Sequence, residues 1–254
     1  MIPSVPESKV QHAWGRLTLW VNQNQGITRL VVLTASLIIF FLFLPPYLRI
    51  VFWNGLQTHK LLASMLFIFS LLGISLVWST GQRLDAWAFL IFNVRGRRPA
   101  WLDLVMKVLT QIGSGSVVFA IALILILIKN HLLSYELMLG TLTLWMMVEL
   151  IKFLVHRSRP FIRLTQTRIV GNRARGRSFP SGHTTQVFFM ATLITQHFHS
   201  SIWVVIMFYA TAFLVGITRM YIGAHYPRDV LAGAILGCVW GLLGGILNPF
   251  HLNL

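Results

Sequence analysis

The chain has 254 residues, of which 56% are hydrophobic and 11% charged, and its formal net charge is +15. Soluble domains carry about a quarter charged residues, so this composition excludes an ordinary soluble protein. The basic residues lie in short loops and at the ends of apolar runs, which predicts anionic or phosphate-bearing membrane lipids, and no nucleic acid, as partners. The single cysteine, Cys238, lies in an apolar run and predicts no disulfide.

The beginning of the chain is polar up to residue 26, so no signal peptide is expected. Within it, Val10, Trp14, Leu17 and Val21 recur at the spacing of a helix that lies in the membrane interface. The apolar runs that follow predict an all-α, polytopic membrane bundle of six to seven spans. These spans are expected near residues 27–45, 60–80, 116–128, 135–155, 184–199, 202–222 and 229–247.

Residues 82–112 differ from the spans, because their apolar positions recur only over short stretches interrupted by polar residues. They predict two short amphipathic surface helices, separated by the turn at 95–99. We therefore expect three parts in the chain. An interfacial helix and a two-span extension occupy 1–81, a core occupies 82–247, and a short tail occupies 248–254.

Alternation of the spans brings the loops at 82–115, 156–182 and 223–228 to one membrane face. That face then gathers six polar residues from three separate loops: Lys152, Arg159, His183, Arg219, His225 and Asp229. Cleavage of a phosphate ester needs cations for the phosphoryl oxygens, a nucleophile, and an acid for the leaving alkoxide. This face therefore has the groups that such a reaction requires.

The first two segments suit the binding of phosphate. Lys152 and Arg159 are seven positions apart, so a helical continuation of their span would place both on one face, and an arginine fork matches phosphate oxygens. Ser181, Gly182 and His183 open the next span. The start of a helix attracts anions, and a glycine there lets the backbone approach closely.

The third segment suits nucleophilic catalysis. His225 and Asp229 are four positions apart at the start of the last span. A carboxylate bonded to one ring nitrogen fixes the histidine tautomer and leaves the other nitrogen free to attack.

Each residue also has a simpler interpretation. Lys152 and Arg159 suit basic anchors at a helix end, His183 and Asp229 suit helix caps, and Glu149 suits a buried hydrogen-bonding residue. The remaining loop arginines suit a solvated face or contacts with lipid head groups: Arg163, Arg168, Arg173, Arg175 and Arg177. These interpretations would require six suitable residues to meet on one face by chance.

Three motifs resemble the signature of the type 2 phosphatidic acid phosphatase (PAP2) superfamily, which includes bacterial lipid phosphatases and the vanadium haloperoxidases. They are Lys152-(six residues)-Arg159-Pro160, Pro180-Ser181-Gly182-His183, and Thr218-Arg219-(five residues)-His225-(three residues)-Asp229. The resemblance covers about residues 82–247. The third motif departs from the usual Ser-Arg beginning, although Thr218 keeps the hydroxyl group.

The resemblance implies a role for each motif residue. His225 would be the nucleophile that forms a phosphohistidine, Asp229 would orient it, and His183 would protonate the leaving alkoxide and then activate water. The phosphoryl oxygens would be held by Lys152, Arg159, Ser181, Gly182 and Arg219. No metal or other cofactor is implied.

The expected function is hydrolysis of a lipid phosphomonoester or pyrophosphate, of the phosphatidylglycerophosphate, phosphatidate, undecaprenyl pyrophosphate or lipid A type. Two alternatives stay open: a lipid phosphotransferase with the same site, and a non-catalytic protein that binds or transports lipids. No obligate protein partner is predicted. Bacterial relatives imply an active site on the periplasmic face of the inner membrane. The positive-inside rule favours the cytoplasmic face, because only Arg49, Lys60 and Lys129 fall on the opposite side.

Overall fold

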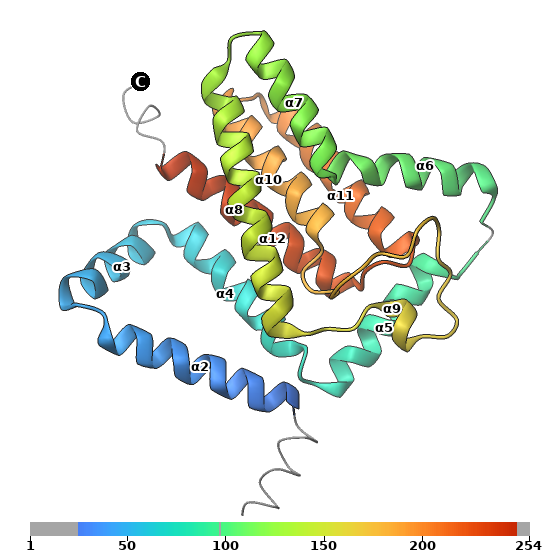
Figure 1. The fold of residues 1–254 in the computed structure, drawn as a ribbon, viewed down its shortest axis with the longest axis horizontal. Coiled ribbons are helices and arrows are strands. Elements are labelled where there is room, and N and C mark those ends of the chain that lie inside the picture. Colours follow the sequence, from blue (N-terminus) through green and yellow to red (C-terminus); the bar gives the residue numbers. More distant parts are fainter. Residues whose placement is uncertain (1–24, 97, 248–254) are drawn as a thin grey trace, which may run out of the picture. The chain divides into compact units, whose positions relative to one another are not determined.

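Every regular element in the described part of the chain is a helix, which confirms the all-α prediction (Figure 1). The computed structural model describes residues 25–96 and 98–247. The interfacial helix predicted around Val10–Val21 and the predicted tail over 248–254 lie outside these ranges. The chain divides into two compact units between Asn54 and Gly55, so the first unit is shorter than the extension predicted over 1–81.

The first unit contains α2 (Gln25–Phe43) and the beginning of α3 (Pro46–Thr58). Two consecutive prolines, Pro45 and Pro46, separate these helices, because proline is accepted at a helix start but not in its interior. The sequence predicted the first helix as a span and no helix over 46–58. Large apolar side chains of α2, such as Ile38 and Phe40, are exposed, as expected of a helix that faces lipid.

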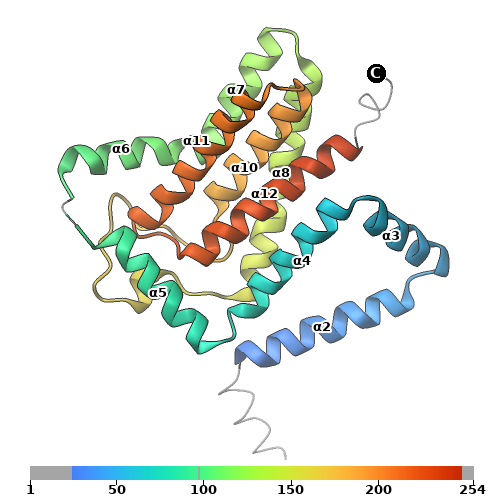
Figure 2. The same ribbon diagram turned by 180° about the vertical axis from the view of Figure 1, so that it is seen from behind.

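The second unit is a helical bundle. Its helices are α4 (Lys60–Ser75), α5 (Ser79–Asn93), α6 (Ala100–Thr110), the 3₁₀ turn η1 (Gln111–Gly113), α7 (Gly115–Leu127), α8 (His131–Val155), the short α9 (Pro160–Arg163), α10 (Gly182–His197), α11 (Ile202–Tyr221) and α12 (Pro227–Leu247). Helix α10 lies at the centre, against α8, α11 and α12 (Figures 1 and 2). The segment between α9 and α10 is irregular and lies at one end of the bundle.

Close contact between α10 and α12 depends on a stripe of glycines. Gly233, Gly237 and Gly241 recur every fourth residue of α12 and face α10. A Cβ atom added at Gly237 would lie 2.3 Å from the carbonyl oxygen of Thr185, well inside van der Waals contact. Small residues at such spacing let two membrane helices pack with their backbones nearly touching.

The lengths of the helices refine the predicted number of spans. Among the described residues, three helices are long and apolar enough to cross a membrane alone, and three pairs of helices joined at sharp bends raise the number to six if each pair is one span. The short helices expected over 82–112 are present as α5 and α6. They are halves of such pairs, because α5 follows α4 at a bend of 98° and α6 precedes α7 at 56°. Helix α10 has only 16 residues, and other helices surround it.

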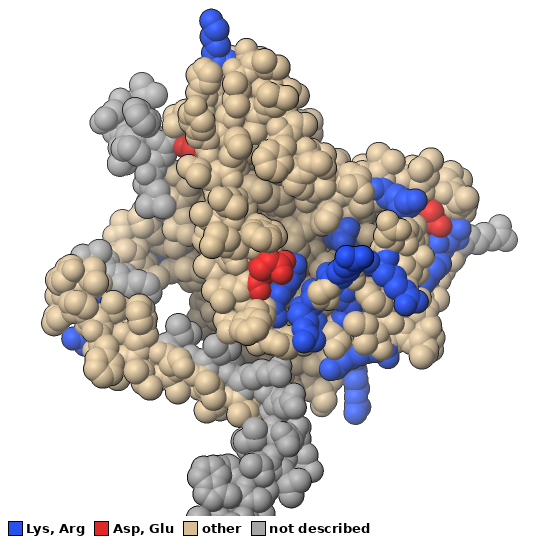
Figure 3. All heavy atoms as spheres, viewed as in Figure 1, with Lys and Arg blue, Asp and Glu red and all other residues tan. Residues whose placement is uncertain are grey.

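Basic side chains gather at the end of the second unit that contains the irregular segment 164–181, whereas the sides of the bundle are apolar (Figure 3). Exposed arginines of this segment and of α9 form much of that basic surface: Arg163, Arg173, Arg175 and Arg177. The exposed flanks carry large apolar side chains such as Phe119, Trp145 and Phe213. This distribution fits a bundle surrounded by lipid, with one strongly basic end in the head-group region.

Candidate active site

The beginning of α10 forms the floor of the site. Gly182 and His183 are the first residues of this helix, and Ser181 precedes them. The backbone N–H of Ser181 donates to the carbonyl oxygen of Asp229 at 3.0 Å, which joins α10 to α12. On the other side, a Cβ atom added at Gly113 would lie 2.5 Å from the carbonyl oxygen of His183. The free N–H groups of α10 are thus held in place where an anion would bind.

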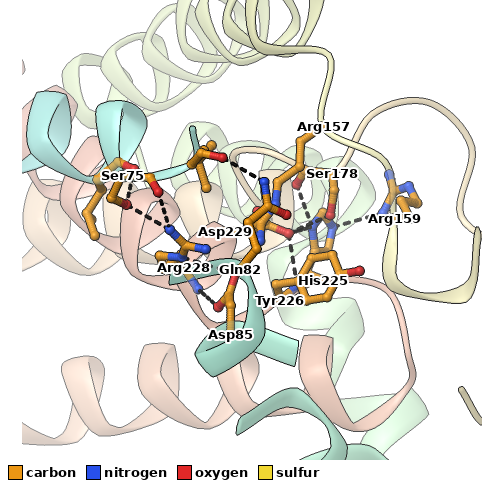
Figure 4. A network of polar contacts seen from close by, with 12 residues as sticks. Ser75, Gln82, Asp85, Arg157, Arg159, Ser178, His225, Tyr226, Arg228 and Asp229 are labelled. Atoms are coloured by element: carbon orange, nitrogen blue, oxygen red, sulfur yellow. Dashed lines mark hydrogen bonds and ion pairs between the residues drawn. The ribbon is translucent and has the colours of Figure 1, made fainter. Parts of the chain in front are cut away.

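His225 lies in the turn between α11 and α12 and is 2% exposed. Its Nδ1 lies 2.7 Å from the carbonyl oxygen of Ser178, which can only accept a hydrogen bond, so Nδ1 is the protonated ring nitrogen. Its Nε2 lies 3.1 Å from Nη1 of Arg159 and therefore accepts from the guanidinium. The tautomer assigned by these contacts leaves an unprotonated Nε2 directed at a cation (Figure 4).

Burial, together with the positive charges of Arg159 and Arg219, lowers the pKa of His225 to about 3, although the nearby Asp229 opposes the shift. The ring is therefore neutral at physiological pH. In the unfolded chain the histidine has its ordinary pKa of about 6.5. Between these two values the unfolded state binds the proton and the folded state does not, so stability falls as the pH falls.

We therefore expect the free energy of unfolding in detergent to decrease between pH 7.5 and pH 5, with part of the decrease due to His225. His225→Gln should reduce this slope, since it removes the group that takes up a proton on unfolding. His59→Gln, at an exposed histidine, is the matched control and should leave the slope unchanged. Chemical unfolding measured at several pH values checks this, and equal slopes for wild type and His225→Gln would contradict it.

Asp229 does not bond directly to His225, which differs from the arrangement predicted from their spacing. Its Oδ2 lies 3.7 Å from Nδ1 of the histidine, too far for a hydrogen bond. The carboxylate instead accepts from the hydroxyl of Ser178, from the backbone N–H of Tyr226 at 2.9 Å, and from Arg157 (Figure 4). Ser178 thus connects the two residues, because its hydroxyl donates to the carboxylate of Asp229 and its carbonyl oxygen accepts from the ring of His225.

Arg159 reaches the site by a route other than a continued helix. Helix α8 ends at Val155, and the following residues run irregularly to α9, so Lys152 and Arg159 do not share a helix face. The guanidinium is held by three backbone carbonyls, those of Arg175, Gly176 and Ala224. A side chain with this many fixed bonds presents its remaining surface to a ligand at little further cost in conformational entropy.

The other two cations flank His183. Arg219 is 6% exposed, and its Nη1 donates to the Thr110 hydroxyl at 2.7 Å. Its Nε is buried and has no hydrogen-bond partner within the described residues, so it is available to a phosphoryl oxygen. Nζ of Lys152 donates to Glu149 at 2.7 Å. The same Nζ lies close to the start of α10, because a Cβ atom added at Gly182 would lie 3.9 Å from it. Glu149 is exposed on α8, which corrects its interpretation as a buried residue.

All the predicted site residues lie at this end of the second unit: Lys152, Arg159, Ser181, Gly182, His183, Arg219, His225 and Asp229. Within the described chain, no group of three or more His, Cys, Asp or Glu side chains is placed to hold a metal ion. The arrangement therefore combines a neutral histidine nitrogen, several cations and a helix start. Such a constellation can bind a phosphoryl group and accept it in a covalent bond.

One arginine that contacts the site residues was not predicted from the sequence. Arg157 is 8% exposed and pairs with both Asp229 and Asp85, although it lies in a loop rich in arginine. The sequence feature that could have indicated Arg157 is the small number of acidic residues, because each carboxylate buried in a bundle needs a basic partner nearby. Outside the site, Arg168, interpreted as solvated or bound to lipid, instead holds Asp103 through two hydrogen bonds of 2.8 and 2.9 Å.

Comparison with known proteins identifies the family of this chain. A family model described as the PAP2 superfamily matches residues 117–248, just over half of the chain. An undecaprenyl-diphosphatase from Sulfolobus acidocaldarius is 30% identical over 139 residues, which cover 54% of this chain and 66% of that protein. The chain spans two thirds or less of the length of the curated relatives that it matches.

Two solved structures are similar in fold. The crystal structure of Aquifex aeolicus LpxE aligns with a TM-score of 0.57 and 28% identity, over 63% of this chain and 94% of that one. A transmembrane PAP2-type phosphatidylglycerolphosphate phosphatase from Bacillus subtilis aligns with a TM-score of 0.65 and 22% identity, over 74% of this chain and 98% of that one. The chain is a multi-pass membrane protein, and it belongs to the PAP2 superfamily.

Proposed function

We propose that the chain is a membrane phosphatase that hydrolyses a phosphomonoester or pyrophosphate carried by a lipid. The observation that carries the proposal is the position of His183, which lines two cavities, one mostly apolar and one of mixed character beside Arg219. Similarity to an undecaprenyl-diphosphatase supports the same substrate class. Phosphate release by the purified protein from phosphatidylglycerophosphate, phosphatidate, undecaprenyl pyrophosphate and lipid A tests it, and release from none of them would refute it.

The larger cavity has a volume of about 420 Å³ and lies between α7, α8 and α10. Its walls are mostly apolar, and exposed side chains at its edge include Phe119, Leu142 and Trp145. The smaller cavity, of about 210 Å³, is lined by Arg219 and by both polar and apolar side chains of α6, α9 and the irregular segment. An acyl or isoprenoid chain suits the first cavity, and a phosphate group suits the cations beside the second.

The proposed reaction proceeds in two steps. Nε2 of His225 attacks phosphorus, the bond from phosphorus to the ester oxygen breaks, and His183 gives its proton to the leaving alkoxide. His183 then removes a proton from water, which attacks the phosphohistidine, so the bond between phosphorus and nitrogen breaks and phosphate leaves. Arg159 and Arg219 neutralise the phosphoryl oxygens throughout, with Lys152 and the N–H groups at the start of α10. The proposal assigns no metal to the reaction, since these groups supply the positive charge.

Obstruction of the larger cavity should affect long-chain lipids selectively. Leu142→Trp adds bulk at the cavity edge, so we expect KM for a long-chain lipid phosphate to rise about 10-fold or more, while hydrolysis of a short, water-soluble phosphate ester stays within about two-fold. Leu139→Trp is the matched control, because Leu139 is also exposed on α8 but does not line the cavity. Steady-state kinetics with both substrates checks this, and an equal loss on both substrates would contradict it.

We also propose that this protein lies in the inner membrane with its site on the periplasmic face, as in the bacterial members that the motifs resemble. Positive charge on the same face favours the opposite orientation. A cysteine introduced at the exposed Arg175 tests the proposal by labelling intact cells with a membrane-impermeant thiol reagent. Labelling only after the cells are opened would refute a periplasmic site.

A further inference from the structure

We propose that Asp85, on α5, is a positioning residue for the reaction: through Arg157 it holds Asp229, and with it the pair Ser178–His225. The inference rests on the proposed function, since it assigns a role relative to His225. Asp85 lies outside the residues that match the family model, so α5 would contribute to the site from beyond the family domain.

Arg157 connects the two carboxylates. One of its terminal nitrogens donates to Oδ2 of Asp85 and the other to Oδ1 of Asp229, so the guanidinium bridges α5 and α12. The guanidinium also lies over the ring of Tyr226, 4.3 Å from its centroid. Asp85 is 4% exposed and Asp229 fully buried. A buried guanidinium whose two terminal nitrogens are both hydrogen-bonded is fixed in position. Arg157 therefore fixes the position of the Asp229 carboxylate relative to that of Asp85.

A second arginine fixes Asp85 in turn. Nε of Arg228 lies 3.2 Å from Oδ2 of Asp85, and its backbone N–H donates to Oδ1 at 3.0 Å. Nη1 of Arg228 reaches back to the carbonyl oxygen and the hydroxyl of Ser75, at 2.8 and 2.9 Å, at the end of α4 (Figure 4). Two carboxylates and two guanidiniums thus form a neutral, largely buried cluster that anchors the first turn of α12.

The cluster reaches the nucleophile through hydrogen bonds. Asp229 accepts from the hydroxyl of Ser178, and the carbonyl of Ser178 accepts from Nδ1 of His225 at 2.7 Å. If Asp85 loses its charge, Arg157 keeps only one carboxylate and can follow it. Asp229 and Ser178 are then no longer held in one position, and the ring of His225 rotates out of the orientation that attack on phosphorus requires. A displacement of about 1 Å costs on the order of 100-fold in rate.

A merely structural ion pair would have a different signature. Asp103 provides the comparison, because it is also paired with a loop arginine, Arg168, but it bonds to no residue of the chain Asp229–Ser178–His225. Loss of either aspartate's charge should lower the stability of the bundle. Only the loss at Asp85 should change the chemical step, with little effect on the binding of the lipid.

The experiment compares Asp85→Asn with Asp103→Asn in detergent-solubilised full-length protein, at equal folded fractions. We expect Asp85→Asn to lower kcat about 10- to 100-fold with KM within about three-fold, and Asp103→Asn to keep kcat within about two-fold. Equal kcat for both variants, or an effect of Asp85→Asn on KM alone, would overturn the proposal. In an Arg157→Met background, Asp85→Asn should have little further effect on kcat, and full additivity would likewise overturn it.

Vanadate imitates the five-coordinate transition state of phosphoryl transfer when a nucleophile bonds to it, so its binding reports the position of His225 without depending on turnover. Asp85→Asn should weaken vanadate binding, measured by calorimetry, about 10-fold or more, whereas Asp103→Asn should not. If the wild type releases no phosphate from any lipid while this difference holds, the proposed function fails and the positioning role stands. If the wild type is active and both variants bind vanadate equally well, the positioning role fails alone.

Discussion

His225→Asn should reduce phosphate release from lipid phosphates by about 10⁴-fold or more, the loss expected when a covalent nucleophile is removed. Asparagine is the sharpest replacement, because its amide can keep the hydrogen bond that Nδ1 donates to Ser178. It places no nitrogen where Nε2 lies beside Arg159. The variant can therefore keep a hydrogen bond to the carbonyl of Ser178, but it lacks the nitrogen that attacks phosphorus.

His197→Asn serves as the control. His197 is another largely buried histidine, and it ends α10 at the opposite end from the site, beside Glu136 of α8. We expect it to lower the thermal midpoint without a loss of specific activity. Acid-labile phosphate on the wild-type protein after a short exposure to substrate, absent from His225→Asn, would identify the intermediate. Substantial phosphate release by a folded His225→Asn protein would end the proposed mechanism.

Gly237→Ala should lower the free energy of unfolding by about 3 kcal/mol, the upper part of the range for overpacked cores. The added carbon would lie 2.3 Å from the carbonyl oxygen of Thr185 and 2.9 Å from the backbone nitrogen of Phe189. Both are backbone atoms of α10, so no side chain can rotate away and the two helices must separate. Because the start of α10 forms the floor of the site, activity should fall as well.

Gly73→Ala, at an interior position of α4, is the opposite case. A Cβ atom added there meets nothing within 4 Å, so it should be neutral or stabilise the fold by up to about 1 kcal/mol through helix propensity. Thermal unfolding in the same detergent compares the two variants. Similar midpoints would show that the contact of α10 with α12 tolerates a wider spacing.

The residues of the three motifs could be predicted from the sequence, because alternation of apolar runs determines which loops share a membrane face. The partners of these residues could not. Arg157 and Asp85 are 72 positions apart, and their contact depends on how α5 packs against α12. Hydropathy contains no information on that packing, so a buried arginine looks the same in sequence as its exposed neighbours Arg173 and Arg175.

The relation between His225 and Asp229 illustrates a second limit. Residues four apart are neighbours on a helix, which favoured a direct bond. Helix α12, however, begins at Pro227, so His225 lies before the helix and its ring takes a different direction. Helical spacing applies only to residues within the helix, and the residue at which a helix begins is the least certain feature of a sequence-based prediction.

The two cavities that meet at His183 have a consequence for the end of the proposed reaction. A bond cleaved at that junction would leave the lipid alcohol with its chain toward the bilayer, beside the exposed rim residues Phe119 and Trp145. The freed phosphate would remain on the side of Arg219 and the irregular segment. The two products would therefore depart into different phases without crossing each other's path, and recombination would be disfavoured by geometry alone.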